Sequence, residues 1–474
     1  MTDRCIHLGD IIEVLADAIP DKAALIAAEG SLTYRQLDQR ATRLANHLLG
    51  EGVVAGDHVA IHAMNCAEWV EAFYACFKLR AVPVNINFRY VERELAYLYD
   101  DSDAVAAIVA PEFADAVPGT LRHRLVMGDE YEAALAAASP DRNFELRSPD
   151  DHYLVYTGGT TGMPKGVVWR QEDIVLGAMN AMRYGRPLER VEDLGDEAAA
   201  AGFQLRLMGL GPMMHGGSQW VMGNTHVAGG AFVLYTGRRF DADDVLDMAA
   251  RAQVTMLSTI GDAMARPIAE ALVAPDAPAR DLSNLLAIGN GGAPLSPSVR
   301  EQLRAALPEI TVIDSYGASE TGAAGTLPDD GEDFAAPRFN TGPEVTVLDD
   351  ELRPCEPGEV GMLARTGHIP LGYHKDAEKT AKTFPAVDGT RWVIPGDFAR
   401  IEDDGNISVL GRGSTSINSG GEKIHPEEVE AALLRHEAVF DAAVIGVPSD
   451  RWGEQVTALV QRRLHVPLGL ARCD

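Results

Sequence analysis

The sequence predicts an α/β protein with more than one domain, and three observations support this. The chain of 474 residues is longer than a single hydrophobic core usually organises. Up to about residue 340, short β-type runs alternate with helical patterns, which is typical of parallel sheets covered by helices. Beyond that point the runs are short and broken by Gly, Pro and Asp turns, which favours an antiparallel or barrel-like element.

The N-terminal elements follow from local patterns. Residues 33–36 fit a helical capping box, after which Leu37, Ala41, Leu44 and Leu48 recur on one helical face. The acidic, alanine-rich stretch 191–202 is predicted to be an exposed insertion. The other predicted elements before residue 340 are strand 58–63, helix 68–80, strand 105–110 and the buried strands 206–211, 231–235, 254–258 and 285–289.

The C-terminal part contains a break in the pattern. Residues 411–421 are rich in glycine and serine and carry little core content, which predicts a linker or hinge. A helix is then expected to begin near Pro426, because proline is favoured at the first helical position and acidic residues follow it. A strand is predicted over 442–447.

Composition excludes some classes of partner. The 41 basic and 70 acidic residues give a net charge of −29, which argues against nucleic acid or an anionic membrane surface as the main partner. The five cysteines form no CxxC pair and no metal-ligand spacing, so a reduced, cytoplasmic setting is expected. The N-terminus has no apolar signal-peptide core, and no transmembrane segment is predicted.

The most informative segment is YTGGTTGMPKGV, residues 156–167. It follows an apolar strand end and combines glycines, threonine hydroxyls and one lysine, which together suit a polyphosphate. It is not a Walker A sequence, because Pro164 precedes Lys165 and Gly166 follows it. The alternative is a flexible surface turn, since Gly, Thr and Pro are turn residues.

Two further segments suit a nucleotide. In DSYGASETG, 314–322, Tyr316 offers an aromatic face, Ser319 a hydroxyl and Glu320 a carboxylate of the kind that Mg²⁺ prefers. The glycines of GNGGAPLS, 289–296, leave room for a flat ligand such as adenine, although a tight turn explains that segment equally well on its own.

Three isolated residues are weaker candidates. His215 lies beside two glycines in 213–217, and a structural hydrogen-bonding role is an even alternative for it. Asp397 follows Pro-Gly, where a carboxylate suits ribose hydroxyls, although Gly-Asp is also a common turn. Arg412 suits a guanidinium contact to ribose or phosphate.

These segments, in this order, resemble the adenylate-forming superfamily of acyl-CoA synthetases, aryl-CoA ligases, luciferases and peptide-synthetase adenylation domains. The resemblance extends from near residue 8 to about residue 461. Segments 87–106, 158–170 and 411–433 are especially similar to actinobacterial fatty-acyl and steroid side-chain CoA ligases. The resemblance therefore implies two half-reactions, in which a carboxylic acid and ATP give acyl-AMP and CoA then displaces AMP.

The resemblance also implies roles for particular residues. Lys165, His215 and Glu320 are the implied catalytic residues, Glu320 and Thr160 the implied Mg²⁺ ligands, and Gly420, Gly421 and Lys423 the implied CoA side. For Lys423, a solvent-facing loop lysine is an equally good interpretation. The residues implied to bind ATP or AMP are Thr157, Gly158, Gly159, Thr160, Thr161, Gly162, Lys165, Gly291, Gly292, Ala293, Pro294, Asp314, Tyr316, Gly317, Ser319, Asp397 and Arg412.

The implied fold is a large N-terminal domain over 1–410, built of two α/β sheet subdomains and a small β-barrel-like part at about 335–410. A hinge at 411–414 leads to a partial α+β lid over 415–474. Ser414 stands where many relatives carry Asp or Lys. The implied substrates are ATP, CoA and a carboxylic acid, with Mg²⁺ as cofactor and a homodimer as one expected state.

The chain departs from the superfamily near its end. Relatives carry a Pro-x-Gly-Lys segment in the lid that this sequence lacks, so impaired adenylation is expected. The half lid is also expected to expose the apolar residues Val444, Ile445, Val456 and Leu459 and to lower solubility. Two alternatives to a CoA ligase are an acyl-AMP ligase that delivers to a carrier protein and a non-catalytic nucleotide or acyl binder.

Overall fold

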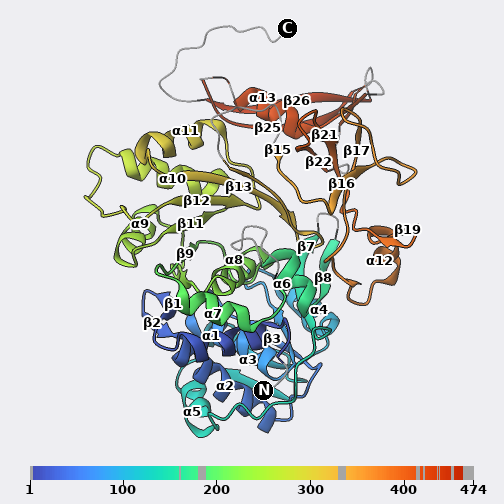
Figure 1. The fold of residues 1–474 in the computed structure, drawn as a ribbon. Coiled ribbons are helices and arrows are strands. Elements are labelled where there is room, and N and C mark those ends of the chain that lie inside the picture. The colour runs from blue at the N-terminus through green and yellow to red at the C-terminus, as the bar shows by residue number, and fades with distance from the viewer. Residues whose placement is uncertain are drawn as a thin grey trace.

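The structure is a computed structural model that describes residues 4–159, 162–179, 188–328, 338–412, 417–419, 422–434, 436, 438–449 and 453–462. Figure 1 shows the N-terminal helices α1, α2, α3 and α5 at one end of the molecule and the C-terminal elements α13, β25 and β26 at the opposite end. Two α/β sheets and an antiparallel sheet lie between these ends.

A four-stranded parallel sheet in the order β4-β3-β5-β6 forms the first α/β subdomain. The predicted capping box is present at the start of α2, where Thr33 and Gln36 exchange hydrogen bonds of 3.2 and 2.9 Å. The predicted apolar face of α2 is fully buried. The elements are α2 (Tyr34–Gly50), β3 (His58–His62), α3 (Ala67–Lys78), β4 (Val82–Asn85), α4 (Glu92–Asp101), β5 (Ala104–Val109), the 3₁₀ helix η1 (Pro111–Ala116), β6 (His123–Val126) and α5 (Asp129–Ala137).

An eight-stranded sheet in the order β14-β13-β12-β11-β9-β10-β1-β2 forms the second subdomain. Its inner strands pair in parallel and its two edge strands antiparallel, and the apolar runs 206–211 and 231–235 form buried strands as predicted. Strands β11 and β12 begin two residues later than predicted. The strands are β1 (Ala23–Ala27), β2 (Gly30–Thr33), β9 (Arg206–Gly209), β10 (Ala231–Leu234), β11 (Met256–Thr259), β12 (Ala287–Gly291), β13 (Thr311–Ala318) and β14 (Gly322–Pro328).

Helices surround this second sheet and link it to the first subdomain (Figure 1). Helix α10 carries Pro267 in its interior. The helices are α1 (Leu8–Ala18), α6 (Gln171–Ala178), α7 (Glu192–Ala200), α8 (Gly216–Val227), α9 (Ala242–Arg251), α10 (Gly261–Val273) and α11 (Pro297–Ala306).

The prediction of an exposed insertion at 191–202 is wrong. Residues Glu192–Ala200 form α7, and Leu194 and Ala198 are buried. Helix α7 packs closely on α1, because a Cβ at Gly195 would lie 2.9 Å from Val14 Cγ1. The small alanine and glycine side chains that suggested a solvated insertion therefore allow helices to approach each other.

The part after residue 338 is antiparallel, as its broken strand pattern predicted. A five-stranded sheet has the order β15-β22-β21-β17-β16, with β15 (Arg338–Phe339), β16 (Val345–Leu348), β17 (Val360–Arg365), β21 (Asp397–Ile401) and β22 (Ile407–Arg412). A second small sheet joins β18 (Gly372–Tyr373) to the hairpin of β7 (His152–Gly159) and β8 (Gly162–Arg170). Helix α12 (Ala377–Thr383) and the pair β19 (Ala386–Val387) and β20 (Thr390–Arg391) complete this part.

The C-terminal part, predicted from the sequence to be a lid and called the lid below, is a four-stranded antiparallel sheet with one helix. Its order is β24-β23-β26-β25, from β23 (Ile417–Ser419), β24 (Glu422–Ile424), β25 (Val439–Ser449) and β26 (Gly453–Arg462), with α13 (Pro426–Leu434) beside β25. The stretch predicted as a linker therefore contains a strand whose Ile417 is buried. The lid touches the larger domain where the Arg266 guanidinium of α10 lies 4.2 Å from the centroid of the Phe440 ring.

The predicted exposure of apolar lid residues is confirmed for Ile445 and Leu459, which are 46% and 62% exposed. It is wrong for Val444, which is buried on the face of β25 that packs against α13. The backbone N–H of Val444 also donates to Glu430 Oε1 of α13 at 2.7 Å. Val456 is half-buried.

Among the described residues, the four cysteines Cys5, Cys66, Cys76 and Cys355 are free thiols. No helix in the described ranges combines the length and the hydropathy needed to cross a membrane.

Candidate active site

The glycine-rich segment forms the tip of the β7–β8 hairpin. Thr157 lies opposite Lys165 across the two strands, and the register shifts between Thr157 and Gly159. Gly158 is exposed, and a Cβ there would find its nearest neighbour, the Tyr90 hydroxyl, 3.8 Å away. The hairpin backbone is therefore open to a ligand at Gly158.

Gly166 serves packing rather than access to a ligand. A Cβ at this position would lie 2.8 Å from Leu154 Cδ1 and 3.0 Å from the Tyr156 ring. A methyl group at that distance would push two buried side chains of β7 aside, so glycine is required for the hairpin to form here.

Lys165 projects from the hairpin toward the start of α12. Its ammonium group forms an ion pair with the Asp376 carboxylate, and the two side chains are 37% and 30% exposed. Asp376 also caps α12 by accepting the Lys379 N–H at 2.9 Å. The hydrogen bond from Lys165 lowers the pKa of Asp376, so this carboxylate is charged and competes with any phosphate for the lysine.

Glu320 lies beside the same hairpin because two contacts attach its turn there. The Tyr373 hydroxyl donates to Glu320 Oε1 at 2.7 Å, and Trp169 Nε1 donates to the Ser319 carbonyl at 3.1 Å. Tyr373 belongs to β18 and Trp169 to β8, which pair with each other. The structure thus brings segment 314–322 to β8, the strand that carries part of segment 156–167. The Lys379 ammonium group lies 4.0 Å from the centroid of the Tyr373 ring.

A buried arginine supports the turn that carries Glu320. The Arg365 guanidinium donates to the carbonyls of Thr321, Ala323 (2.8 Å) and Gly177 (3.0 Å). Burial lowers the pKa of Arg365. Gly322 has φ of +68°, and a Cβ there would lie 2.6 Å from the Gly177 carbonyl oxygen, so the turn tolerates no larger residue.

Tyr316 and Asp397 meet although 81 residues separate them in the sequence. The Tyr316 hydroxyl donates to Asp397 Oδ2 at 2.7 Å, and the Tyr316 ring lies 5.4 Å from that of Phe339 at an interplanar angle of 41°. Asp397 is buried and lies opposite Arg412 in the β21–β22 pair. The segment 314–322 and the candidate ribose ligand therefore lie together. Gly317 lies at a strand irregularity of β13.

The predicted adenine segment follows β12 and is organised by Asn290. The Asn290 amide donates to the Ala293 carbonyl and to Asp314 Oδ1, both at 3.0 Å, and its oxygen accepts the Gly261 N–H at 2.7 Å. Asp314 also forms an ion pair with Arg300. Gly291 pairs with Ser315 of β13, so Gly291, Gly292, Ala293 and Pro294 follow directly at the carboxyl end of neighbouring parallel strands, where open α/β sheets bind ligands.

His215 lies at the N-cap of α8 with an exposed side chain. Partial desolvation by the surrounding protein and then the positive charge of Arg89 lower its pKa. A Cβ at the adjacent Gly216 would lie 3.1 Å from Val155 Cγ2, which places the start of α8 against β7. Because its pKa is lowered, the His215 ring is favoured in its neutral form at neutral pH.

Several predicted positions lie outside the described residues: Thr160, Thr161, Ser414, Gly420 and Gly421. The side chains of Arg412 and Lys423 are likewise not described, although their backbones form part of β22 and β24. The hinge prediction over 411–414 begins within β22, where Gly411 has φ of +109°.

Sequence reasoning missed four residues that organise the site, Tyr373, Asp376, Arg365 and Asn290. Asn290 lies within the predicted adenine segment, but the other three lie outside the glycine-rich segments. The remaining three act through tertiary contacts with segments more than 40 residues away. Of these three, Asp376 carried a local signal, because aspartate is a preferred N-cap residue at the start of a helix.

The arrangement combines a lysine and an exposed glycine of the hairpin with the carboxylate of Glu320 beside it, which suits a polyphosphate with a divalent cation. Comparison with family models decides the assignment. The model described as AMP-binding enzyme matches residues 12–374, and that of the AMP-binding enzyme C-terminal domain matches 428–468. The chain belongs to the AMP-binding enzyme family.

Curated relatives of this AMP-binding enzyme match over nearly its whole length. It is 43% identical to the 3-oxocholest-4-en-26-oate–CoA ligase of Rhodococcus rhodochrous, with 97% of this chain and 87% of the relative covered. It is 42% identical to the medium/long-chain-fatty-acid–CoA/3-oxocholest-4-en-26-oate–CoA ligase of Mycobacterium tuberculosis, with 99% and 89% covered.

Solved structures share the fold. ATP-bound MatB from Rhodopseudomonas palustris superposes with a TM-score of 0.82 at 25% identity, covering 98% of this chain and 90% of MatB. The anthranilate CoA ligase AuaEII in complex with anthranoyl-AMP gives a TM-score of 0.83 at 23% identity, covering 97% and 88%. The AMP-binding enzyme therefore has the mixed α/β architecture of these adenylate-forming enzymes.

Proposed function

We propose that this AMP-binding enzyme is an ATP- and Mg²⁺-dependent acyl-CoA ligase for a long-chain fatty acid or a steroid side-chain acid. The observation that carries the proposal is 42–43% identity, over 97–99% of the chain, to relatives named for these activities. The contacts of Lys165 and Glu320 at the hairpin support the same chemistry.

In the first half-reaction, the substrate carboxylate attacks the α-phosphorus of ATP, the bond to the β-phosphate breaks, and acyl-AMP and pyrophosphate form. Catalysis of such a step is mainly positioning and charge neutralisation. The Lys165 ammonium group would leave the Asp376 carboxylate and pair with the leaving phosphates. Asp397 would accept hydrogen bonds from the ribose hydroxyls.

The chain offers a fitting ligand for Mg²⁺. Glu320 is half-buried beside the hairpin, and Tyr373 orients its carboxylate through a hydrogen bond. Glu320 and Thr160 would hold the ion together with the phosphates. When bound, Mg²⁺ supplies positive charge that neutralises the phosphate oxygens.

In the second half-reaction, the CoA thiolate attacks the acyl carbonyl, and AMP leaves as the thioester forms. Gly420, Gly421 and Lys423 would face CoA, and the lid would rotate about 411–414 between the two steps. This part of the proposal rests on the family resemblance.

The test measures AMP release with acids of graded chain length and ring content, with and without CoA. Release that depends on both a long-chain or steroid acid and CoA is expected. Acid-dependent pyrophosphate release without thioester formation would favour the acyl-AMP ligase, and ATP binding by calorimetry without any acid-dependent release would favour the non-catalytic binder.

Four expectations from the sequence stay predictions. Pyrophosphate exchange against the Rhodococcus relative tests whether adenylation is impaired. Light scattering after size exclusion tests the homodimer, and its monodispersity tests the expected low solubility. Fractionation of the native host tests the cytoplasmic setting, with which the free thiols of the described cysteines are compatible.

A further inference from the structure

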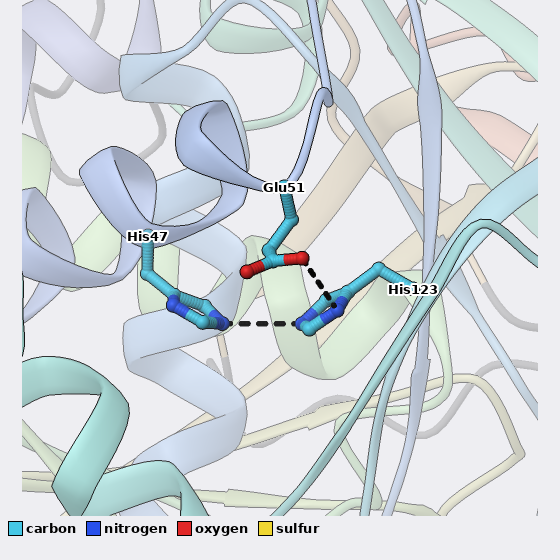
Figure 2. A group of neighbouring side chains, drawn as sticks. All are labelled: His47, Glu51 and His123. Atoms are coloured by element: carbon cyan, nitrogen blue, oxygen red, sulfur yellow. Dashed lines mark hydrogen bonds and ion pairs between the residues drawn. The ribbon is translucent and has the colours of Figure 1, made fainter.

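Two histidines and a glutamate cluster in the first α/β subdomain (Figure 2). His47 lies in the last turn of α2, and Glu51 follows one turn later as the residue that caps this helix. His123 is the first residue of β6, far from α2 in the sequence. Residues four apart on a helix face the same side, so His47 and Glu51 both face His123.

The donor atoms of the three side chains converge. His47 Nε2 and His123 Nε2 lie 3.1 Å apart. Glu51 Oε2 lies 3.5 Å from Nδ1, the other nitrogen of the His123 ring, so this second contact orients the ring. One potential ligand atom from each residue lies within 4.8 Å of the others, and no other group of histidine, cysteine and carboxylate side chains in the described ranges meets this criterion. Figure 2 shows the Glu51 carboxylate above the gap between the two rings.

This geometry is close to that of a zinc site. Zinc binds imidazole nitrogens at about 2.0–2.1 Å, so two such ligands at a tetrahedral angle lie about 3.3 Å apart. The observed separation of 3.1 Å is close to this distance, and a small side-chain rotation would close the difference. We propose that His47, Glu51 and His123 form a binding site for Zn²⁺ or a similar borderline transition-metal cation.

The surroundings of His47 favour the form of its ring that binds metals. Burial and then the charge of His123 lower the pKa of His47, which favours the neutral imidazole that binds metals. His47 and His123 are half-buried and Glu51 is exposed, so solvent can supply the fourth ligand. Nitrogen and carboxylate ligands select zinc, nickel or copper over magnesium, which prefers oxygen ligands.

The site is separate from the candidate active site. Helix α2 lies at the end of the molecule opposite the lid (Figure 1). A cation bound here would join the C-terminal end of α2 to the start of β6 and thereby stabilise the first subdomain. It would take no part in acyl transfer, so the inference does not depend on the proposed function.

Calorimetric titration of the full chain with ZnCl₂ tests the proposal. The protein carries no polyhistidine tag and is first dialysed against EDTA and then against metal-free buffer. One equivalent is expected to bind with a dissociation constant in the micromolar range or below. His47→Asn and His123→Asn should each weaken binding about tenfold or more, and Glu51→Gln by a smaller factor.

His436→Asn is the matched control, because His436 is an exposed histidine of the lid outside the cluster and Asn retains an acceptor for the Ala438 N–H. This variant should bind Zn²⁺ as the wild type does. Circular dichroism establishes that each variant is folded. As a second readout, one equivalent of Cu²⁺ should give an electron paramagnetic resonance spectrum with splitting from two nitrogen ligands.

Two results would overturn the inference. The first is the absence of saturable binding in the wild type, which would leave the 3.1 Å contact as a hydrogen bond between two neutral imidazoles. The second is unchanged binding in the His47→Asn/His123→Asn double variant, which would place the ion elsewhere on the acidic surface.

Discussion

Two lysines paired with carboxylates differ in one property, their exposure to water. Lys78 of α3 is fully buried and donates to Glu13 at 2.7 Å and to Asp38 at 2.5 Å. Lys165 of the hairpin is 37% exposed and pairs with the half-buried Asp376. A buried charge cannot leave its partners without a large desolvation penalty, whereas a half-exposed one can exchange a carboxylate for a ligand.

The surroundings of the two lysines reinforce this difference. Arg147 donates to Glu13 at 2.6 Å and Arg142 to Asp38 at 2.6 Å, so each buried carboxylate of the Lys78 cluster has two cationic partners. Although burial alone raises the pKa of Glu13, the charges of Lys78 and Arg147 lower it to about 2. The Lys78 cluster thus holds α1, α2 and α3 together. The Lys165–Asp376 pair instead leaves the Lys165 ammonium group accessible to a ligand.

The largest expected effect is that of Lys78→Met on stability. The substitution removes the charge that faces two buried carboxylates, and breaking a buried pair in this way costs about 3–5 kcal/mol. The midpoint of chemical unfolding of the N-terminal part, followed by tryptophan fluorescence, should fall accordingly. Lys375→Met is the control, because Lys375 pairs with Asp103 at 2.7 Å but is 42% exposed, and such pairs contribute about 1 kcal/mol or less. Equal losses in both variants would contradict the distinction between the clusters.

Lys165→Met should have the opposite profile, with a large loss of activity and a small loss of stability. Removal of one group that stabilises charge in the transition state typically costs about 10²–10³ in rate. Pyrophosphate exchange should therefore fall about 100-fold, while the unfolding midpoint changes little. Lys22→Met provides the control, since Lys22 is half-buried and donates to the Ala198 carbonyl away from the site. A normal exchange rate in Lys165→Met would show that this lysine does not act on the phosphates.

Tyr373→Phe tests whether the hydrogen bond from Tyr373 to Glu320 serves Mg²⁺ binding rather than packing. Loss of the hydrogen bond to Glu320 should raise the Mg²⁺ concentration needed for half-maximal exchange about tenfold. Tyr131→Phe is a matched control, because Tyr131 also donates to a glutamate, Glu71, at 2.7 Å, but outside the site. Both variants should lose similar stability, and a shift of the Mg²⁺ dependence in both would refute the assignment.

The sequence was sufficient for many of the elements. The capping box at Thr33 and the apolar runs of the parallel strands are local signals, so they survive in the structure. The prediction for 191–202 failed because alanine and glycine are compatible both with a solvated stretch and with close helix packing, and the partner α1 is distant in sequence.

The partners of the motif residues could not be predicted for the same reason. Tyr373 and Arg365 are ordinary polar residues in their local sequence, and the N-cap signal of Asp376 does not identify Lys165 as its partner. The pairing of β18 with β8 brings Tyr373 and Asp376 to the hairpin. The cation of Lys165 was identified from its glycine-rich surroundings, but its carboxylate partner depends on the tertiary fold.

Asp376→Asn gives the smallest and most discriminating effect. Asparagine retains an oxygen that can accept the Lys379 N–H, so the cap of α12 and the stability should be preserved. The substitution removes the charge that competes with phosphate for Lys165, so the KM for ATP should fall a few-fold while kcat changes less. A KM that rises instead would mean that Asp376 positions Lys165 for the phosphates, and the half-exposed pair would then be as fixed a part of its site as the Lys78 cluster is of the core.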